Sequence, residues 1–125
     1  MQTLISTARQ ITGVGALSRA PKRMLAPIVR DAAGYERLLV LRNYESIAII
    51  LNINFYESLL KSVGHEMPAY EDISLTDLQR RAKEIMHTVS ENGGAMRVNI
   101  EAEAVAVVVN VEKFEQILDR LEQKQ

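Results

Sequence analysis

The chain has 125 residues, enough for one ordinary domain or for two very small half-domains that share a core. It contains no cysteine, which excludes disulfides, thiolate catalysis and cysteine-ligated zinc. The net charge is −1, but residues 1–65 hold eight bases and four acids, whereas residues 66–125 hold seven bases and twelve acids. The basic first half suits an anionic partner, and an ordinary solvated surface explains it almost as well.

Neither a membrane span nor a secretory signal is expected. No apolar run approaches the roughly 18–20 residues that a span requires. The N-terminus, MQTLISTARQITG, lacks the apolar core of a signal peptide. We therefore expect a cytoplasmic protein without membrane contact.

The first half predicts short helices followed by a β-hairpin. In residues 18–32, Pro21 fits a first helical turn but Pro27 should break or kink a helix, so two short helices are expected. Residues 37–51 predict a hairpin, with strands at 37–42 and 46–51. Asn52 is then a good N-cap for a helix, and Leu51 and Tyr56 stand at the two positions of a hydrophobic staple.

The second half follows residues 63–71, which we interpret as a linker. Residues 74–91 have helical apolar spacing, with Ser74 or Thr76 as N-cap and Asn92-Gly93-Gly94 as the stop. Residues 95–109 predict a second hairpin, with a tight turn near Glu101. Asn110 should cap a last helix over residues 111–122, with Val109 and Phe114 in the staple positions.

Residues 48–60 and 106–118 have nearly the same sequence at a spacing of 58 residues. The identical pairs are Ala48/Ala106, Asn52/Asn110, Glu57/Glu115 and Leu60/Leu118. The match extends upstream without a gap, so that Arg23 aligns with Arg81. We interpret the chain as a degenerate tandem repeat of helix, two strands and helix, divided into residues 1–62, a linker at 63–71, and residues 72–125. On the second strand of each half one face carries a pair of small residues, Ser46/Ala48 and Ala104/Ala106, which either admits a close neighbour or fills a tight core.

The repeated segments AIILNINFYESLL and AVVVNVEKFEQIL resemble a segment of the prevent-host-death (Phd/YefM) antitoxins, in which a strand with an Ala-Val-Leu pattern enters a helix. The resemblance covers residues 72–120 well and residues 14–62 more loosely. Asn stands here in place of the usual Ser cap.

The resemblance implies an α+β fold with a mainly antiparallel sheet, in which two helix–hairpin–helix repeats form a single-chain pseudo-dimer. It also implies a DNA-binding, antitoxin-like repressor of a toxin–antitoxin operon, with a toxin protein as a candidate partner. Self-association through the sheet or the terminal helices is a further candidate interaction. The chain ends directly after the last expected helix, so the family's toxin-wrapping tail is not expected. The family often has an arginine early in its first helix. At the corresponding positions this chain has Pro21 in the first half and Gln79 in the second.

Phosphate contacts require several Lys and Arg side chains on one surface. A pseudo-dyad would make Lys22-Arg23 and Arg80-Arg81 symmetric basic pairs. The candidate DNA-binding residues are Arg9, Arg19, Lys22, Arg23, Arg80, Arg81 and Lys83. The alternative is that these side chains are only solvated helix surface, and that the chain is a protein-interaction module that has lost DNA binding.

Enzymatic activity is not expected. The two histidines, His65 and His87, have no further ligands at metal spacing and no nucleophile arrangement around them. We therefore predict no catalytic residue, no metal and no cofactor.

Overall fold

The computed structural model describes residues 10–124, which form an α+β protein with five helices and a mixed six-stranded sheet. In chain order the elements are β1 (Gln10–Gly13), α2 (Val14–Arg19), α3 (Pro21–Val29), β2 (Leu38–Arg42), β3 (Glu45–Asn52), α4 (Ile53–Ser62), β4 (Glu71–Ser74), α5 (Leu75–Asn92), β5 (Met96–Ile100), β6 (Glu103–Asn110) and α6 (Val111–Lys124). No helix within this range is long and apolar enough to cross a membrane.

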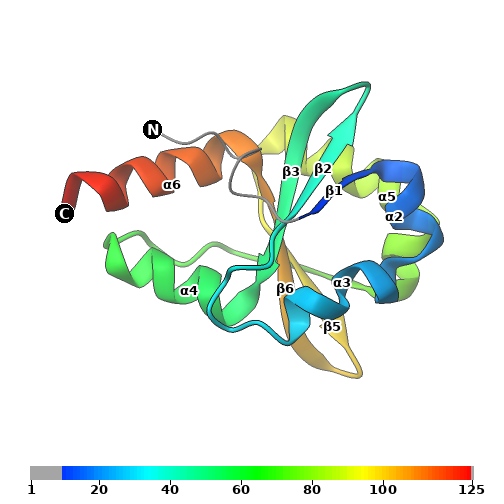
Figure 1. Cartoon of the computed structure of the whole chain (residues 1–125), viewed down its shortest axis with the longest axis horizontal. Helices are drawn as coiled ribbons and strands as arrows, with labels where there is room; N and C mark the ends of the chain where they lie inside the picture. The colour runs from blue at the N-terminus through cyan, green and yellow to red at the C-terminus, as the bar shows by residue number, and fades with distance from the viewer. Residues whose placement is uncertain (1–9, 125) are drawn as a thin grey trace.

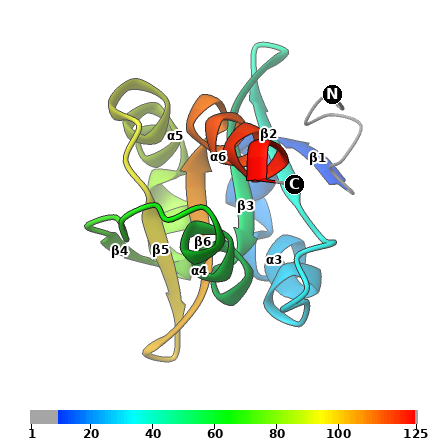
Figure 2. The ribbon, with the colours of Figure 1, turned by 90° about the vertical axis from the view of Figure 1, so that its left-hand side faces the viewer.

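The strands lie in the order β1-β2-β3-β6-β5-β4, as Figure 2 shows from the side of α4 and α6. The three central pairings are antiparallel, but β1 pairs with β2 and β4 pairs with β5 in parallel. The sheet is therefore mixed, which corrects the expectation of a mainly antiparallel one. The cause is a pair of short edge strands, each joined to its neighbour by helices that cross over one face of the sheet.

Helices cover both faces of the sheet (Figure 1). On one face, α2, α3 and α5 bury Leu17, Leu25 and Met86 against the small side chains of Ala48 and Ala106. On the other face, α4 and α6 bury a second cluster that includes Tyr56, Leu60, Phe114 and Ile117. The strands alternate between these two clusters, because successive side chains point to opposite faces of a sheet.

The two expected hairpins are present and have the same irregularities. Their turn residues all have positive φ: Asn43 (50°), Tyr44 (67°), Glu101 (52°) and Ala102 (66°). Two successive left-handed residues fit the twist of a two-residue hairpin loop. The register shifts between Val40 and Leu41 in one hairpin, and between Val98 and Asn99 in the other. Turns and shifts thus occur at the spacing of 58 residues that the sequence predicted.

The central pairing has the same symmetry. In the β3–β6 ladder Ile50 lies opposite Val108, and these two residues correspond at the spacing of 58. Ala48 pairs with Asn110, while Asn52 pairs with Ala106, so exchanging the halves reproduces the register. An approximate two-fold axis therefore passes between Ile50 and Val108.

Upstream of the hairpins the ungapped alignment is wrong by three residues. Gly13 pairs with Leu41, and Ser74 pairs with Asn99. Leu41 corresponds to Asn99 at a spacing of 58, so Gly13 corresponds to Ser74 at a spacing of 61. The spacing of 61 also matches buried helical residues: Leu17 with Leu78, Leu25 with Met86, and Ile28 with Val89.

The helices before each hairpin break at equivalent places. Two short helices were expected in the first half and are present, but the break is at Ala20 (φ −145°, ψ 59°), and Pro27 lies inside α3. The second half was expected to have one longer helix. It has a kink at Arg81 (φ −127°, ψ 24°), which is 61 residues after Ala20.

The predicted caps are confirmed. The Ser74 side chain accepts a hydrogen bond from Asp77 N while the Asp77 carboxylate accepts one from Ser74 N, and Gly93 ends α5 in the left-handed conformation. Asn52 caps α4 through Asn54 N and Phe55 N, and Asn110 accepts from Lys113 N.

Candidate nucleic-acid interface

The approximate two-fold axis passes through a contact between α2 and α5. The Ser18 hydroxyl donates a hydrogen bond of 2.6 Å to the backbone carbonyl of Gln79. Ser18 and Gln79 correspond at the spacing of 61, so equivalent residues meet each other at this point. The contact lies on the face of the sheet that α2, α3 and α5 cover, opposite the face that α4 and α6 cover (Figure 1).

Exposed basic side chains flank this contact in equivalent pairs. Arg19 and Arg80 follow Ser18 and Gln79 directly in the chain, and both are exposed. Lys22 and Lys83 lie three residues further along, beyond the breaks at Ala20 and Arg81, and are exposed as well. Four cations thus stand in two symmetric pairs near one end of the axis.

This pairing corrects the one expected from sequence. Lys22-Arg23 does not correspond to Arg80-Arg81, because the three-residue offset places Arg23 opposite Glu84 instead. The same offset makes Ser18, and not Pro21, the first-half residue that corresponds to Gln79. The expected symmetry of basic residues is present in a different set of pairs.

Arg81 is exposed but engaged in local ion pairs. Its guanidinium contacts a carboxylate oxygen of Glu84 at 3.1 Å and one of Asp77 at 3.9 Å. The hydrogen bonds to Glu84 raise the pKa of Arg81, and the guanidinium in turn lowers the pKa of the Glu84 carboxyl. These carboxylates partly compensate the positive charge of Arg81, so it should attract a phosphate less strongly than Arg80 does. No ion pair of Arg80 is found among residues 10–124.

The charge around the contact is unequal between the halves. Residues 10–30 contain four arginines or lysines and no acid, whereas α5 combines its three bases with acids, among them Glu84 and Glu91. At the spacing of 61, Arg23 corresponds to Glu84, and Arg30 to Glu91. The first half therefore has the more positive flank. Arg9, the remaining candidate, and most of the segment 1–13 lie outside the described residues.

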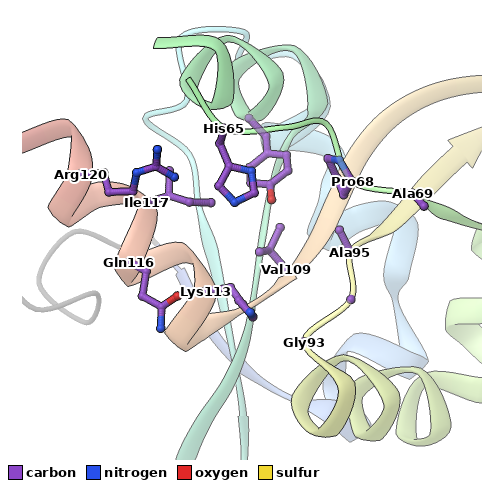
Figure 3. Close-up of a pocket in the computed structure, with 12 residues that line it drawn as sticks. His65, Pro68, Ala69, Gly93, Ala95, Val109, Lys113, Gln116, Ile117 and Arg120 are labelled. Atoms are coloured by element: carbon purple, nitrogen blue, oxygen red, sulfur yellow. The ribbon is translucent and has the colours of Figure 1, made fainter. Parts of the chain in front are cut away.

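A pocket lies on the other face of the sheet, where the loop after α4 passes α6 (Figure 3). It has a volume of about 300 Å³, and its lining includes His65, Lys113 and Arg120. His65 and His87 are both exposed, and no cluster of three possible metal-ligating side chains occurs between residues 10 and 124. Lys113 and Arg120 are not among the residues predicted from the sequence motifs. The sequence does contain one sign of this site: at the spacing of 58, Lys113 corresponds to Phe55, so the two halves differ in residue type there.

Comparison with known proteins gave no relative. Neither protein-family models, nor curated proteins, nor solved structures include a match to this chain.

Proposed function

We propose that this protein is a single-chain pseudo-dimer of Phd/YefM-like repeats that binds double-stranded DNA as a transcriptional repressor. The observation that carries the proposal is the pair of symmetric cation pairs, Arg19 with Arg80 and Lys22 with Lys83, on either side of the Ser18–Gln79 contact. The repeat resemblance adds the class of repressor, an antitoxin-like regulator of a toxin–antitoxin operon.

The symmetry supports DNA rather than an arbitrary anion. The two strands of a duplex are related by two-fold axes, so a protein with the same symmetry presents equal contacts to both half-sites. Dimeric repressors obtain this symmetry from two chains. Here the β3–β6 ladder joins two similar halves within one chain, and it supplies the same relation without association.

The expected contacts are to phosphates. Lysine and arginine side chains on helices bind phosphate oxygens by displacing condensed counterions, which makes affinity depend on salt. Four neutralised phosphates give a slope of log K against log salt of about −3.6. Between residues 10 and 124, no arrangement of side chains on this face argues for reading a particular base sequence, so the proposal concerns affinity and not the operator.

The test is a binding titration against labelled fragments of genomic DNA, at several salt concentrations between about 50 and 200 mM. The double variant Arg19→Ala/Arg80→Ala should remain folded, because exposed charges contribute little to stability. It should weaken binding to all fragments and reduce the magnitude of the salt slope by about two.

A matched comparison uses single charge removals. Arg80→Ala should reduce the slope by about one, whereas Lys61→Ala, an exposed lysine on α4 across the sheet, should leave it unchanged. No binding by the wild-type protein at low salt, or an unchanged slope in the folded double variant, would reject DNA binding. The protein-interaction module would then be the better description.

A further inference from the structure

The pocket beside α6 exists because the two halves differ at one place in the fold. In the first half the equivalent space is filled by Arg37, whose guanidinium carbon lies 5.3 Å from the centroid of the Phe55 ring and 5.6 Å from that of Phe114. Arg37 also donates from Nε to the carbonyl of Gly34 at 3.0 Å. Its guanidinium is thus enclosed by two rings and anchored to the backbone.

In the second half the filling groups are absent. At the spacing of 58, Ala95 stands in place of Arg37, and Lys113 in place of Phe55. The backbone around them is similar: Phe55 passes so close to Gly34 that a Cβ there would lie 2.2 Å from the ring, and the Lys113 stem passes Gly93, where a Cβ would lie 3.0 Å from Cε. The space that Arg37 fills in one half is therefore the open pocket in the other.

The lining combines an apolar floor with positively charged side chains. Its floor is apolar, formed by Ala95, Val109, Ile117 and the ring of Tyr56. Two cations, Lys113 and Arg120, line it from α6, with the amide of Gln116 between them in the chain. Figure 3 shows these side chains along one helix, with the His65 ring on the opposite side of the opening. Among the residues that the structure describes, no aspartate or glutamate contributes to the lining.

Two of the polar side chains that line the pocket, Arg120 and His65, contact backbone carbonyls. Arg120 donates one hydrogen bond of 3.0 Å to the carbonyl of Val63, which fixes the guanidinium and leaves other donors available. His65 Nδ1 lies 2.7 Å from the carbonyl of Glu66. Burial raises the pKa of Tyr56 to about 12, so its hydroxyl stays protonated and adds no negative charge at neutral pH.

We propose that this pocket binds a small organic anion, a carboxylate or phosphate monoester whose apolar body rests on Ala95, Val109 and Tyr56 while Lys113 and Arg120 hold the charged group. Its volume is at the lower end of ligand pockets, which suits a compact molecule with one ring. The site lies across the sheet from the proposed DNA contact and does not depend on it.

The experiment is a titration of the isotope-labelled protein with phenyl phosphate, benzoate and benzyl alcohol at concentrations up to about 10 mM, followed by NMR. The two anions should shift the amide signals of Ala95, Gly94 and Lys113. The neutral alcohol should bind at least about tenfold more weakly, because hydrogen bonds to a charged group are the stronger ones. Inorganic phosphate serves as a further probe. If the apolar body contributes to binding, inorganic phosphate should bind more weakly than phenyl phosphate does; equal binding would mean that the pocket captures a phosphate alone.

Three variants decide the outcome. Lys113→Gln should weaken anion binding about tenfold, whereas Lys61→Gln, which removes an exposed lysine outside the lining, should not change it. Ala95→Arg introduces an arginine at the position that corresponds to Arg37, so its side chain should fill the pocket and abolish binding. If that variant does not fold, Lys113→Gln still decides, because Lys113 is exposed. Absence of shifts with either anion, equal binding of the alcohol, or unchanged affinity in Lys113→Gln would each overturn the proposal.

Discussion

Replacement of Asn52 by alanine tests whether one side chain joins two helices. Asn52 is buried, with 3% of its surface exposed. Its side-chain oxygen accepts from Asn54 N (2.9 Å) and Phe55 N (3.3 Å) at the start of α4. Its amide nitrogen lies 3.0 Å from the carbonyl of Ile28 and 3.3 Å from that of Val29, at the end of α3. The side chain thus caps one helix and satisfies the last carbonyls of another.

The cost of Asn52→Ala follows from these contacts. Loss of an N-cap lowers the free energy of unfolding by about 1 kcal/mol. Loss of the amide donor removes two hydrogen bonds, one to the Ile28 carbonyl, which keeps its bond from Asp31 N, and one to the Val29 carbonyl; at about 0.5–1.5 kcal/mol each they add about 1–3 kcal/mol. We therefore expect the free energy of unfolding to fall by about 2–4 kcal/mol.

Two variants separate the contributions. Asn52→Ser keeps a capping oxygen but removes the donor, so it should lower the free energy of unfolding by about 1–2 kcal/mol. Asn110 makes the equivalent contacts to the carbonyls of Val89 and Ser90, and it accepts from one backbone N–H, that of Lys113, where Asn52 accepts from two. It is only partly buried, so water replaces some of the lost bonds and Asn110→Ala should cost less, about 1–2 kcal/mol.

Urea unfolding followed by circular dichroism measures all three variants. The reasoning fails if Asn52→Ser is as stable as wild type, since the donor to α3 would then contribute nothing. It also fails if Asn110→Ala is more destabilising than Asn52→Ala, because burial would not be what sets the cost.

Two further predictions concern the turns and the edge of the sheet. Gly34 has φ +80° and a Cβ there would lie 2.2 Å from the Phe55 ring, whereas Gly64 has φ +69° and open space around it. In urea unfolding Gly34→Ala should cost about 3 kcal/mol or more and Gly64→Ala only about 1–2, and equal costs would contradict the packing argument. Hydrogen bonds from Arg97 and Asn99 lower the pKa of Asp72 from 3.8 to about 2, so its ionised form stabilises the fold above about pH 4 and this contribution is lost as the pH falls toward 2. Asp72→Asn should therefore be less stable than wild type at pH 7, with a gap in urea midpoint that closes toward pH 2; a gap that does not depend on pH would show that the carboxylate charge is not its cause.

The features that the sequence predicted correctly depend on neighbours along the chain. The caps at Ser74 and Asn110 connect a side chain to a backbone N–H three residues away, so the residue types alone indicate them. The hairpins follow from apolar strands around a short connection, even though Asn43-Tyr44 and Glu101-Ala102 lack the glycine typical of such turns. Small residues at Ala48 and Ala106 indeed face the helices α2, α3 and α5.

The features that it missed depend on contacts between distant segments. The edge strands β1 and β4 have four residues each, too few for a pattern, and they form by pairing in parallel with β2 and β5. The three-residue offset between the halves has the same origin, since only the strand register shows that Gly13 corresponds to Ser74. The kink at Arg81 was missed because the apolar spacing continues across it, from Leu78 to Ala82 and Ile85.

The distance of a position from the two-fold axis explains which similarities between the halves persist. At Ile50 and Val108, or at Ser18 and Gln79, equivalent residues contact each other, so a change in one half alters the packing of the other. Where equivalent residues do not contact each other there is no such constraint, and there Arg37 corresponds to Ala95 and Arg23 to Glu84. The proposed DNA contact is therefore symmetric near the axis and biased toward the first half at its flank. The proposed anion pocket lies where the halves are free to differ, and it is accordingly expected once per chain.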